Sequence, residues 1–175
     1  MAEMRLASVR RDLASGAPVI LLQETVGRRA LPIFIGVAEA QSMLQVIQGE
    51  VSPRPLTYEL FVTVLGEAGV TLERVVVTEL VDKTFFAELH LLVRGERRVV
   101  SARPSDAVNL ALRAGCPIFC DDDLLAAEGV ELDPGELDDD EDEDDEDPPG
   151  RPEDQESLVS EFNKFIENLK PEDFA

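Results

Sequence analysis

The chain has 175 residues, of which 44% are hydrophobic, and its formal net charge is −21 at pH 7. This length corresponds to about one domain and the hydrophobic content is enough to bury a core, so a soluble globular protein is expected. The charge is uneven, because residues 1–132 contain 13 Lys and Arg against 18 Asp and Glu, and the remainder carries −16. No basic surface of the kind that gives affinity for a nucleic-acid backbone is obvious.

The N-terminal residues 1–6 contain no continuous apolar run, and no stretch approaches the roughly 20 apolar residues needed to cross a bilayer. We therefore expect a cytoplasmic protein with no membrane partner. The two cysteines, Cys116 and Cys120, have no second Cys or His cluster that would complete a zinc site. We interpret them as reduced, buried structural residues.

Three segments near the N-terminus have the composition of β-strands, because they are rich in Val, Ile and Leu and are separated by turn residues. The predicted strands are Arg5–Arg11, Pro18–Glu24 and Leu31–Ile35. Apolar residues then recur at helical spacing over residues 40–47 and again over residues 60–68. Gly49 ends the first predicted helix, Thr57 is the expected N-cap of the second, and Gly69 is its expected left-handed C-terminal residue.

The second half of the chain repeats this order. Its predicted strands are Arg74–Glu79, Phe85–Val93 and Arg97–Ala102, the last two joined at Arg94 and Gly95. A helix is expected from Pro104 to Gly115, because proline is favoured at the first helical position and glycine at the end. A short strand, Pro117–Cys120, and a short helix with an aspartate cap, Asp123–Glu128, complete this half.

The two halves match when one is shifted by 67 residues, which places Glu39 and Ala40 on Asp106 and Ala107. The number and order of strands also agree. We therefore predict an α+β fold in which duplicated strand-strand-strand-helix units form one domain, residues 1–132.

Residues 133–154 differ in composition from the rest, since Asp138 to Asp147 is an unbroken run of ten acids. Such a run repels itself and cannot bury a core, so a disordered acidic linker is expected. Apolar residues recur at helical spacing after it, which predicts a C-terminal amphipathic helix within residues 155–175. We expect this helix to dock through Phe162, Phe165 and Ile166, because a short isolated helix is marginal in water.

Residues 102–107 place a cation, a helix-starting proline, a hydroxyl and a carboxylate at one junction between strand and helix. A helix N-terminus of this kind favours phosphate binding through backbone N–H groups and the helix dipole. Three ordered motifs in the chain then resemble the bifunctional nuclease domain family of bacteria and plants over about residues 4–132. These motifs are Leu31-Pro32-Ile33-Phe34-Ile35-Gly36 with Glu39-Ala40, Arg54-Pro55-Leu56-Thr57, and Ala102-Arg103-Pro104-Ser105-Asp106-Ala107 with Pro117-Ile118-Phe119.

This resemblance implies an α+β fold of duplicated units, a homodimer, and nuclease activity on DNA and RNA. One position departs from the family pattern. The family typically has Thr-His-Asp-Leu where this chain has Thr57-Tyr58-Glu59-Leu60. An imidazole exchanges protons near neutral pH, whereas an ordinary phenol titrates near pH 10 and stays protonated. If the family histidine is a general base, Tyr58 weakens this member.

Phosphodiester cleavage needs charge stabilisation at phosphorus and an activated water, commonly through divalent metal ions held by carboxylates. We expect Glu39, Glu59 and Asp106 as the catalytic residues and as ligands of magnesium or manganese, with no organic cofactor. The expected substrate-binding residues are Arg54, Thr57, Tyr58, Arg103 and Ser105. Arg54 or Arg103 would bind phosphate in a bidentate manner. The sole histidine, His90, lies in a predicted apolar strand and is expected to be an ordinary strand residue.

Two structural interpretations remain open at these positions. Acids in the first turn of a helix stabilise it by roughly 0.3–1 kcal/mol each. This stabilisation alone would explain why positions 39 and 106 are the acidic residues Glu39 and Asp106. Arg103 and Asp106 would equally form a buried ion pair between the halves. An alternative function is therefore a non-catalytic dimeric adaptor that binds a basic protein partner through its acidic tail and C-terminal helix. If the protein is instead a nuclease, the acidic tail would compete with nucleic acid for a cationic groove.

Overall fold

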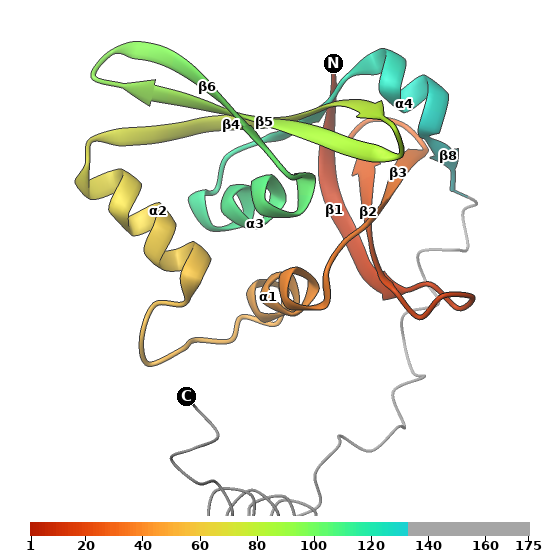
Figure 1. The fold of residues 1–175 in the computed structure, drawn as a ribbon, viewed down its shortest axis with the longest axis horizontal. Coiled ribbons are helices and arrows are strands. Elements are labelled where there is room, and N and C mark those ends of the chain that lie inside the picture. Colours follow the sequence, from red (N-terminus) through yellow and green to blue (C-terminus); the bar gives the residue numbers. More distant parts are fainter. Residues whose placement is uncertain (133–175) are drawn as a thin grey trace, which may run out of the picture. The chain divides into compact units, whose positions relative to one another are not determined.

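The computed structural model describes residues 1–132, which form an α+β domain of eight strands and four helices (Figure 1). The strands are β1 (Ala2–Arg11), β2 (Pro18–Glu24), β3 (Arg29–Phe34), β4 (Val70–Val81), β5 (Thr84–Val93), β6 (Glu96–Ala102), β7 (Ile118–Cys120) and β8 (Val130–Glu131). The helices are α1 (Val37–Ile47), α2 (Thr57–Glu67), α3 (Pro104–Ala114) and α4 (Asp122–Glu128). The predicted acidic linker, 133–154, and the predicted C-terminal helix, 155–175, lie outside the described residues.

All eight strands belong to one mixed sheet with the order β6-β5-β4-β7-β1-β2-β3-β8. Two antiparallel meanders, β1-β2-β3 and β4-β5-β6, lie on either side of β7. Strand β7 is parallel to β4 and antiparallel to β1. This three-residue strand therefore joins the two meanders through backbone hydrogen bonds.

The pairing between strands explains why several strands are longer than predicted. β1 begins at Ala2 because residues 2–4 pair with β7, and β3 begins at Arg29 because its first two residues pair with β8. β4 extends at both ends because it pairs with β5 from Val70 to Val81. The two-residue strand β8 was not predicted, since its pairing with β3 spans a hundred residues of sequence and leaves no local pattern.

The predicted helix ends are confirmed at three glycines, Gly49, Gly69 and Gly115, which adopt left-handed φ angles of 67°, 71° and 64°. Pro104 is the first residue of α3, and the Asp121 carboxylate accepts hydrogen bonds from the first turn of α4. The expected N-cap at Thr57 was wrong by one residue. Leu56 is the N-cap of α2, because the Glu59 side chain supplies the acceptor for its backbone N–H.

The core lies between the curved sheet and the helices. Helix α3 contacts α1, α2, β4 and β5, and its apolar face is buried through residues such as Val108 and Leu110 (Figure 1). Buried strand residues from both meanders, including Leu22 and Val75, belong to the same apolar core. Helix α3 packs on β4 and β5, whereas α1 contacts β1 and β2, so the contact between α1 and α3 brings the starts of these two helices together. Within residues 1–132, no helix is long and apolar enough to cross a bilayer.

Candidate functional site

The site is organised around Arg103, the residue between β6 and α3. It has extended backbone angles and serves as the N-cap of α3, so its side chain lies beside the first helical turn. Its Nε donates to Asp106 Oδ2 at 2.7 Å and its Nη2 donates to Asp106 Oδ1 at 3.0 Å. This bidentate pair fixes the plane of the guanidinium group.

A second carboxylate reaches the same guanidinium from α1. Glu39 Oε1 lies 2.9 Å from Arg103 Nη2, and the Glu39 side chain is only 16% exposed. Gly36, the N-cap of α1, provides the space for this approach, because a Cβ at Gly36 would lie 2.1 Å from Glu39 Oε2. The absence of a side chain at Gly36 thus allows the Glu39 carboxylate to fold back over the start of its own helix.

Helix α2 contributes a hydroxyl group. Tyr58 Oη donates a hydrogen bond of 2.7 Å to Asp106 Oδ1, which joins α2 to α3 across 48 residues of sequence. We call the four residues Glu39, Tyr58, Arg103 and Asp106 the Arg103 cluster. The cluster therefore holds two carboxylates, one guanidinium and one phenol, contributed by three helices.

Proton affinities in the cluster follow from these contacts. Burial and the hydrogen bond to Asp106 raise the pKa of Tyr58, so its hydroxyl stays protonated at neutral pH. Burial acts to raise the pKa of Asp106, but hydrogen bonds from Arg103 and Tyr58 outweigh it and the pKa lies below its usual value. The hydrogen bond to Asp106 raises the pKa of Arg103. Asp106 and Arg103 thus remain charged, and Tyr58 remains neutral.

A second arginine, Arg113 of α3, supports the cluster from within the protein and was missed by the sequence analysis. Its side chain is 5% exposed and donates to the carbonyl and amide oxygens of Asn109 and to the carbonyl and hydroxyl of Ser42. Its guanidinium carbon lies 5.4 Å from the centroid of the Tyr58 ring. Arg113 thus links α1, α2 and α3. The only sequence signal was a charged residue within an apolar helix.

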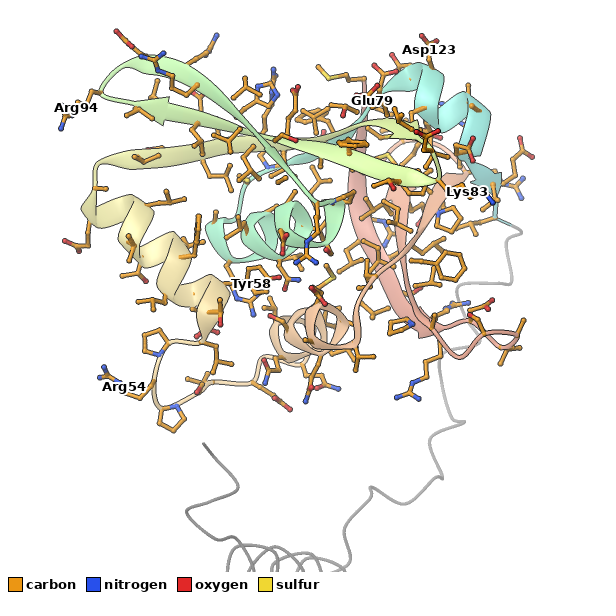
Figure 2. All side chains as sticks on the ribbon, viewed as in Figure 1. Arg54, Tyr58, Glu79, Lys83, Arg94 and Asp123 are labelled. Atoms are coloured by element: carbon orange, nitrogen blue, oxygen red, sulfur yellow. The ribbon has the colours of Figure 1, made fainter. Side chains whose placement is uncertain are left out.

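The remaining predicted site residues lie outside the Arg103 cluster. Glu59 accepts the Leu56 N–H at 3.0 Å and lies 3.9 Å from Arg113 Nε. Arg54 lies on the exposed loop before α2, away from Tyr58 (Figure 2). Thr57 is exposed at the start of α2, and Ser105 is buried in the first turn of α3. The structure therefore brings together four of the eight predicted residues.

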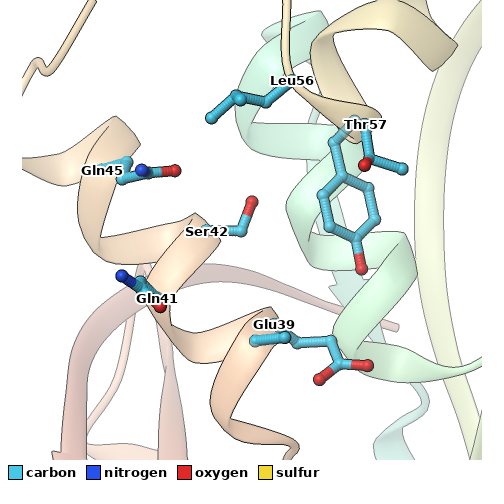
Figure 3. Close-up of a pocket in the computed structure, with 8 residues that line it drawn as sticks. Glu39, Gln41, Ser42, Gln45, Leu56 and Thr57 are labelled. Atoms are coloured by element: carbon cyan, nitrogen blue, oxygen red, sulfur yellow. The ribbon is translucent and has the colours of Figure 1, made fainter. Parts of the chain in front are cut away.

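Two grooves lie beside the cluster. The first, of about 450 Å³, separates α1 from the start of α2, and its lining residues include Glu39, Ser42 and Thr57 (Figure 3). The second, of about 300 Å³, lies between the end of β3, the turn between β4 and β5, and the start of α3, and Arg103 is among its lining residues. Glu39 and Arg103, which are paired, therefore face different grooves.

The arrangement of the carboxylates does not fit the predicted metal ion. Within residues 1–132 no three His, Cys, Asp or Glu side chains are grouped so that they could hold a metal. Glu39 and Asp106 instead share the Arg103 guanidinium, and Glu59 binds the start of its own helix. A positive charge from the protein thus occupies the place between the two carboxylates.

His90 and the two cysteines have structural surroundings. His90 Nε2 lies 3.1 Å from Glu88 on β5, and its Nδ1 lies 3.5 Å from Arg74 of the neighbouring strand. Burial raises the pKa of Cys116 to about 11 and that of Cys120 to about 12, so both are neutral thiols at pH 7. Both cysteines are free in the structure, and Cys120 is fully buried whereas Cys116 is half-buried, so the expectation that both are buried is wrong for Cys116.

Comparison with known proteins gives one family and two kinds of relative. A family model described as the bifunctional nuclease domain matches residues 20–133. An uncharacterized protein of Mycobacterium tuberculosis is 36% identical over 175 residues, which cover 99% of this chain and 98% of that protein.

Plant proteins are similar over a shorter region. Bifunctional nuclease 1 of Oryza sativa subsp. japonica is 29% identical over 111 residues, 62% of this chain and 34% of that protein. Bifunctional nuclease 2 of Arabidopsis thaliana is 27% identical over 130 residues, 72% of this chain and 40% of that protein. The chain thus matches a bacterial relative along almost its whole length, and it matches well under half of each plant relative.

Proposed function

Because the chain belongs to the bifunctional nuclease domain family, we propose that it hydrolyses phosphodiester bonds of DNA and RNA with low sequence specificity, at the Arg103 cluster. The observation that carries this proposal is the state of the Arg103 guanidinium. Two carboxylates hold its Nε and Nη2, the side chain is 65% exposed, and its Nη1 has no partner among residues 1–132. A positioned guanidinium with an unused N–H edge suits a phosphate oxygen.

Glu39 is the best candidate for the general base. Asp106 accepts hydrogen bonds from both Arg103 and Tyr58, and its lowered pKa makes it a poor proton acceptor. Glu39 makes a single contact with Arg103 and lines the groove between α1 and α2. We propose that Glu39 takes a proton from a water that attacks phosphorus. The bond between phosphorus and the leaving sugar oxygen breaks, and that oxygen takes a proton from solvent.

Asp106 and Tyr58 then act as positioning residues. Asp106 fixes the plane of Arg103, and Tyr58 restrains Asp106 by donating to Oδ1, the oxygen that also accepts from Arg103 Nη2. Tyr58 replaces the family histidine and keeps its proton at neutral pH, so it does not serve as the base. On this proposal Tyr58→His increases cleavage only if an imidazole at this position takes over proton transfer.

The duplicated-unit interpretation of the fold is also proposed. Glu39 and Asp106 are the third residues of α1 and α3, each helix follows a three-strand meander, and both acids bind Arg103. Equivalent positions of the two units thus meet at one guanidinium. Duplication accounts for how two acids far apart in sequence come to share one partner.

A cleavage assay tests the proposed function. Highly purified protein is incubated with labelled single-stranded DNA and RNA, with magnesium, with manganese, and with a chelator. We expect Glu39→Gln and Arg103→Gln to reduce cleavage at least tenfold, while Glu67→Gln, which changes an exposed acid at the end of α2, leaves it unchanged. The chelator arm tests the predicted metal requirement. Equal cleavage by all variants would show that the activity belongs to a contaminant and would refute the proposal.

A second candidate, a dimeric adaptor for a basic protein partner, is favoured by helix α2. Leu60, Phe61 and Val64 of this helix are each about half exposed, and none of its residues is buried. An exposed apolar helix face of this kind marks an interaction surface. Light scattering on the full chain would give the mass of a dimer on this view, and Phe61→Asp would reduce it to that of a monomer. A monomeric full chain would argue against the adaptor and against the homodimer.

A further inference from the structure

The groove between the end of β3 and the start of α3 combines an exposed aromatic ring with two cations. Its lining includes Phe34, Phe85, Lys83 and Arg103, and its volume is about 300 Å³. We propose that this groove binds one unpaired nucleobase against Phe34, with the adjoining phosphate on Lys83 and Arg103. The inference rests on the proposed function, because it names the form of nucleic acid that the Arg103 cluster receives.

The Phe34 ring is exposed in the groove and is not packed in the core, so it is available to stack on a base. It is the last residue of β3 and is 62% exposed, whereas its neighbour Ile33 is 3% exposed and belongs to the core. The Phe34 ring therefore contributes little to burying apolar surface within residues 1–132. An exposed aromatic side chain in a groove is the usual platform for a base of single-stranded nucleic acid.

Lys83 supplies a second positive charge to the groove. It lies in the turn between β4 and β5, where Asp82 and Lys83 have φ angles of 48° and 63° (Figure 2). Its ammonium group is exposed and has no ion-pair partner among residues 1–132. Arg103 Nη1, which also lacks a partner within these residues, lines the same groove. Two available cationic side chains in one groove can bind a phosphate, even though acidic residues outnumber basic residues on this surface.

The size and place of the groove favour an unpaired base. Its volume is at the lower end of the range for small-ligand sites, which suits one nucleobase and excludes a duplex. Arg103 lies both in this groove and in the Arg103 cluster. A nucleobase bound on Phe34 therefore leaves its phosphate on Arg103, at the edge of the Arg103 cluster, and orders the scissile bond before cleavage.

Binding measurements test the inference without requiring cleavage. Binding of the protein is measured by fluorescence anisotropy with a labelled oligothymidine of ten nucleotides and with an abasic strand that has the same number of phosphates. We expect Phe34→Ala to weaken oligothymidine binding at least about fivefold and to leave the abasic strand unchanged. Lys83→Gln should weaken both strands, and it should reduce the slope of log affinity against log salt by about 0.7.

Two matched variants serve as controls. Phe86→Ala removes another exposed ring, from β5, and Arg94→Gln removes a cation from the turn between β5 and β6. Neither control should show the loss of oligothymidine affinity that we expect for Phe34→Ala and Lys83→Gln. Equal loss of both strands in Phe34→Ala, no loss at all, or equally tight binding of a blunt duplex would overturn the inference. Binding without cleavage would refute the proposed function and leave this groove assignment intact.

Discussion

Three acids occupy the same local position but serve different purposes. Glu39, Glu59 and Asp106 are each the third residue of a helix. Glu59 accepts the N–H of its own N-cap residue, which is the ordinary use of an acid at this position. Glu39 and Asp106 turn to Arg103 instead. Sequence spacing alone could not separate these cases, because the difference depends on which neighbour the fold brings to each helix start.

The lowered pKa of Asp106 makes a pH-dependent prediction. A carboxyl whose folded pKa lies below the unfolded value of about 3.9 stabilises the fold above that value, and the contribution is lost as pH falls through the folded pKa. We expect Asp106→Asn to reduce the free energy of unfolding at pH 7 by about 1–2 kcal/mol. The deficit should shrink at pH 3. Urea denaturation at both pH values measures it, with Asp82→Asn in an exposed turn as the control. A deficit that is constant with pH would show that charge is not the cause.

Glu39 and Gly36 give a prediction about substrate affinity. Removing the Glu39 charge leaves Arg103 more available to phosphate, so Glu39→Gln should bind single-stranded DNA about two- to fivefold more tightly at low salt while cleaving it more slowly. Gly36→Ala should act in the same direction, because its Cβ would displace the Glu39 carboxylate. Anisotropy and cleavage assays measure the two effects. If Gly36→Ala weakens binding, the carboxylate does not restrain Arg103 as described.

At the scale of elements, local sequence patterns predicted most of the structure. Alternating apolar residues and glycine positions identified seven of the strands and the four helices, because both signals are local. Helix bounds followed from Pro104 and Gly115. The contacts that matter for the site are not local: Tyr58 reaches Asp106 across 48 residues, and Arg113 reaches Ser42 across 71. Such pairings depend on how α2 and α1 pack on α3, which no periodic pattern encodes.

Arg113 provides a prediction about helix packing. Its two terminal nitrogens make four hydrogen bonds to α1 and α3, and a lysine offers one compact ammonium in their place. We expect Arg113→Lys to lower the free energy of unfolding by about 2–3 kcal/mol, because buried acceptors lose their donors. Urea denaturation measures this, with Arg94→Lys in an exposed turn as the matched control. Equal stability of the two variants would mean that Arg113 does not hold the helices together.

At the scale of the whole molecule, the distribution of charge predicts how the acidic residues affect binding. Residues 133–175 carry a net charge of −16, and nucleic acid is also anionic. Ending the chain at Leu132 should strengthen single-stranded DNA binding at low salt, and high salt should erase most of the difference, because exposed charges are screened over about 8–10 Å. Anisotropy across a salt series measures this. Replacing the acids of residues 138–147 with their amides keeps the length and should have a similar effect. Equal low-salt affinities of shortened and full chains would contradict the prediction.

Because β7 pairs with both meanders, the alkylation rates of the two nearby cysteines should report how often the sheet opens. Cys120 lies at the end of the strand between the two meanders and is fully buried, whereas Cys116 lies at the junction of α3 and β7 and is half-buried. A thiol-alkylating reagent should therefore modify Cys116 at the rate of local fluctuations and Cys120 only when the sheet separates. Mass spectrometry of the unmodified protein would follow both rates at once. Modification of Cys120 thus measures how often the two halves come apart, without any substitution, and comparable rates at the two thiols would show that β7 detaches easily.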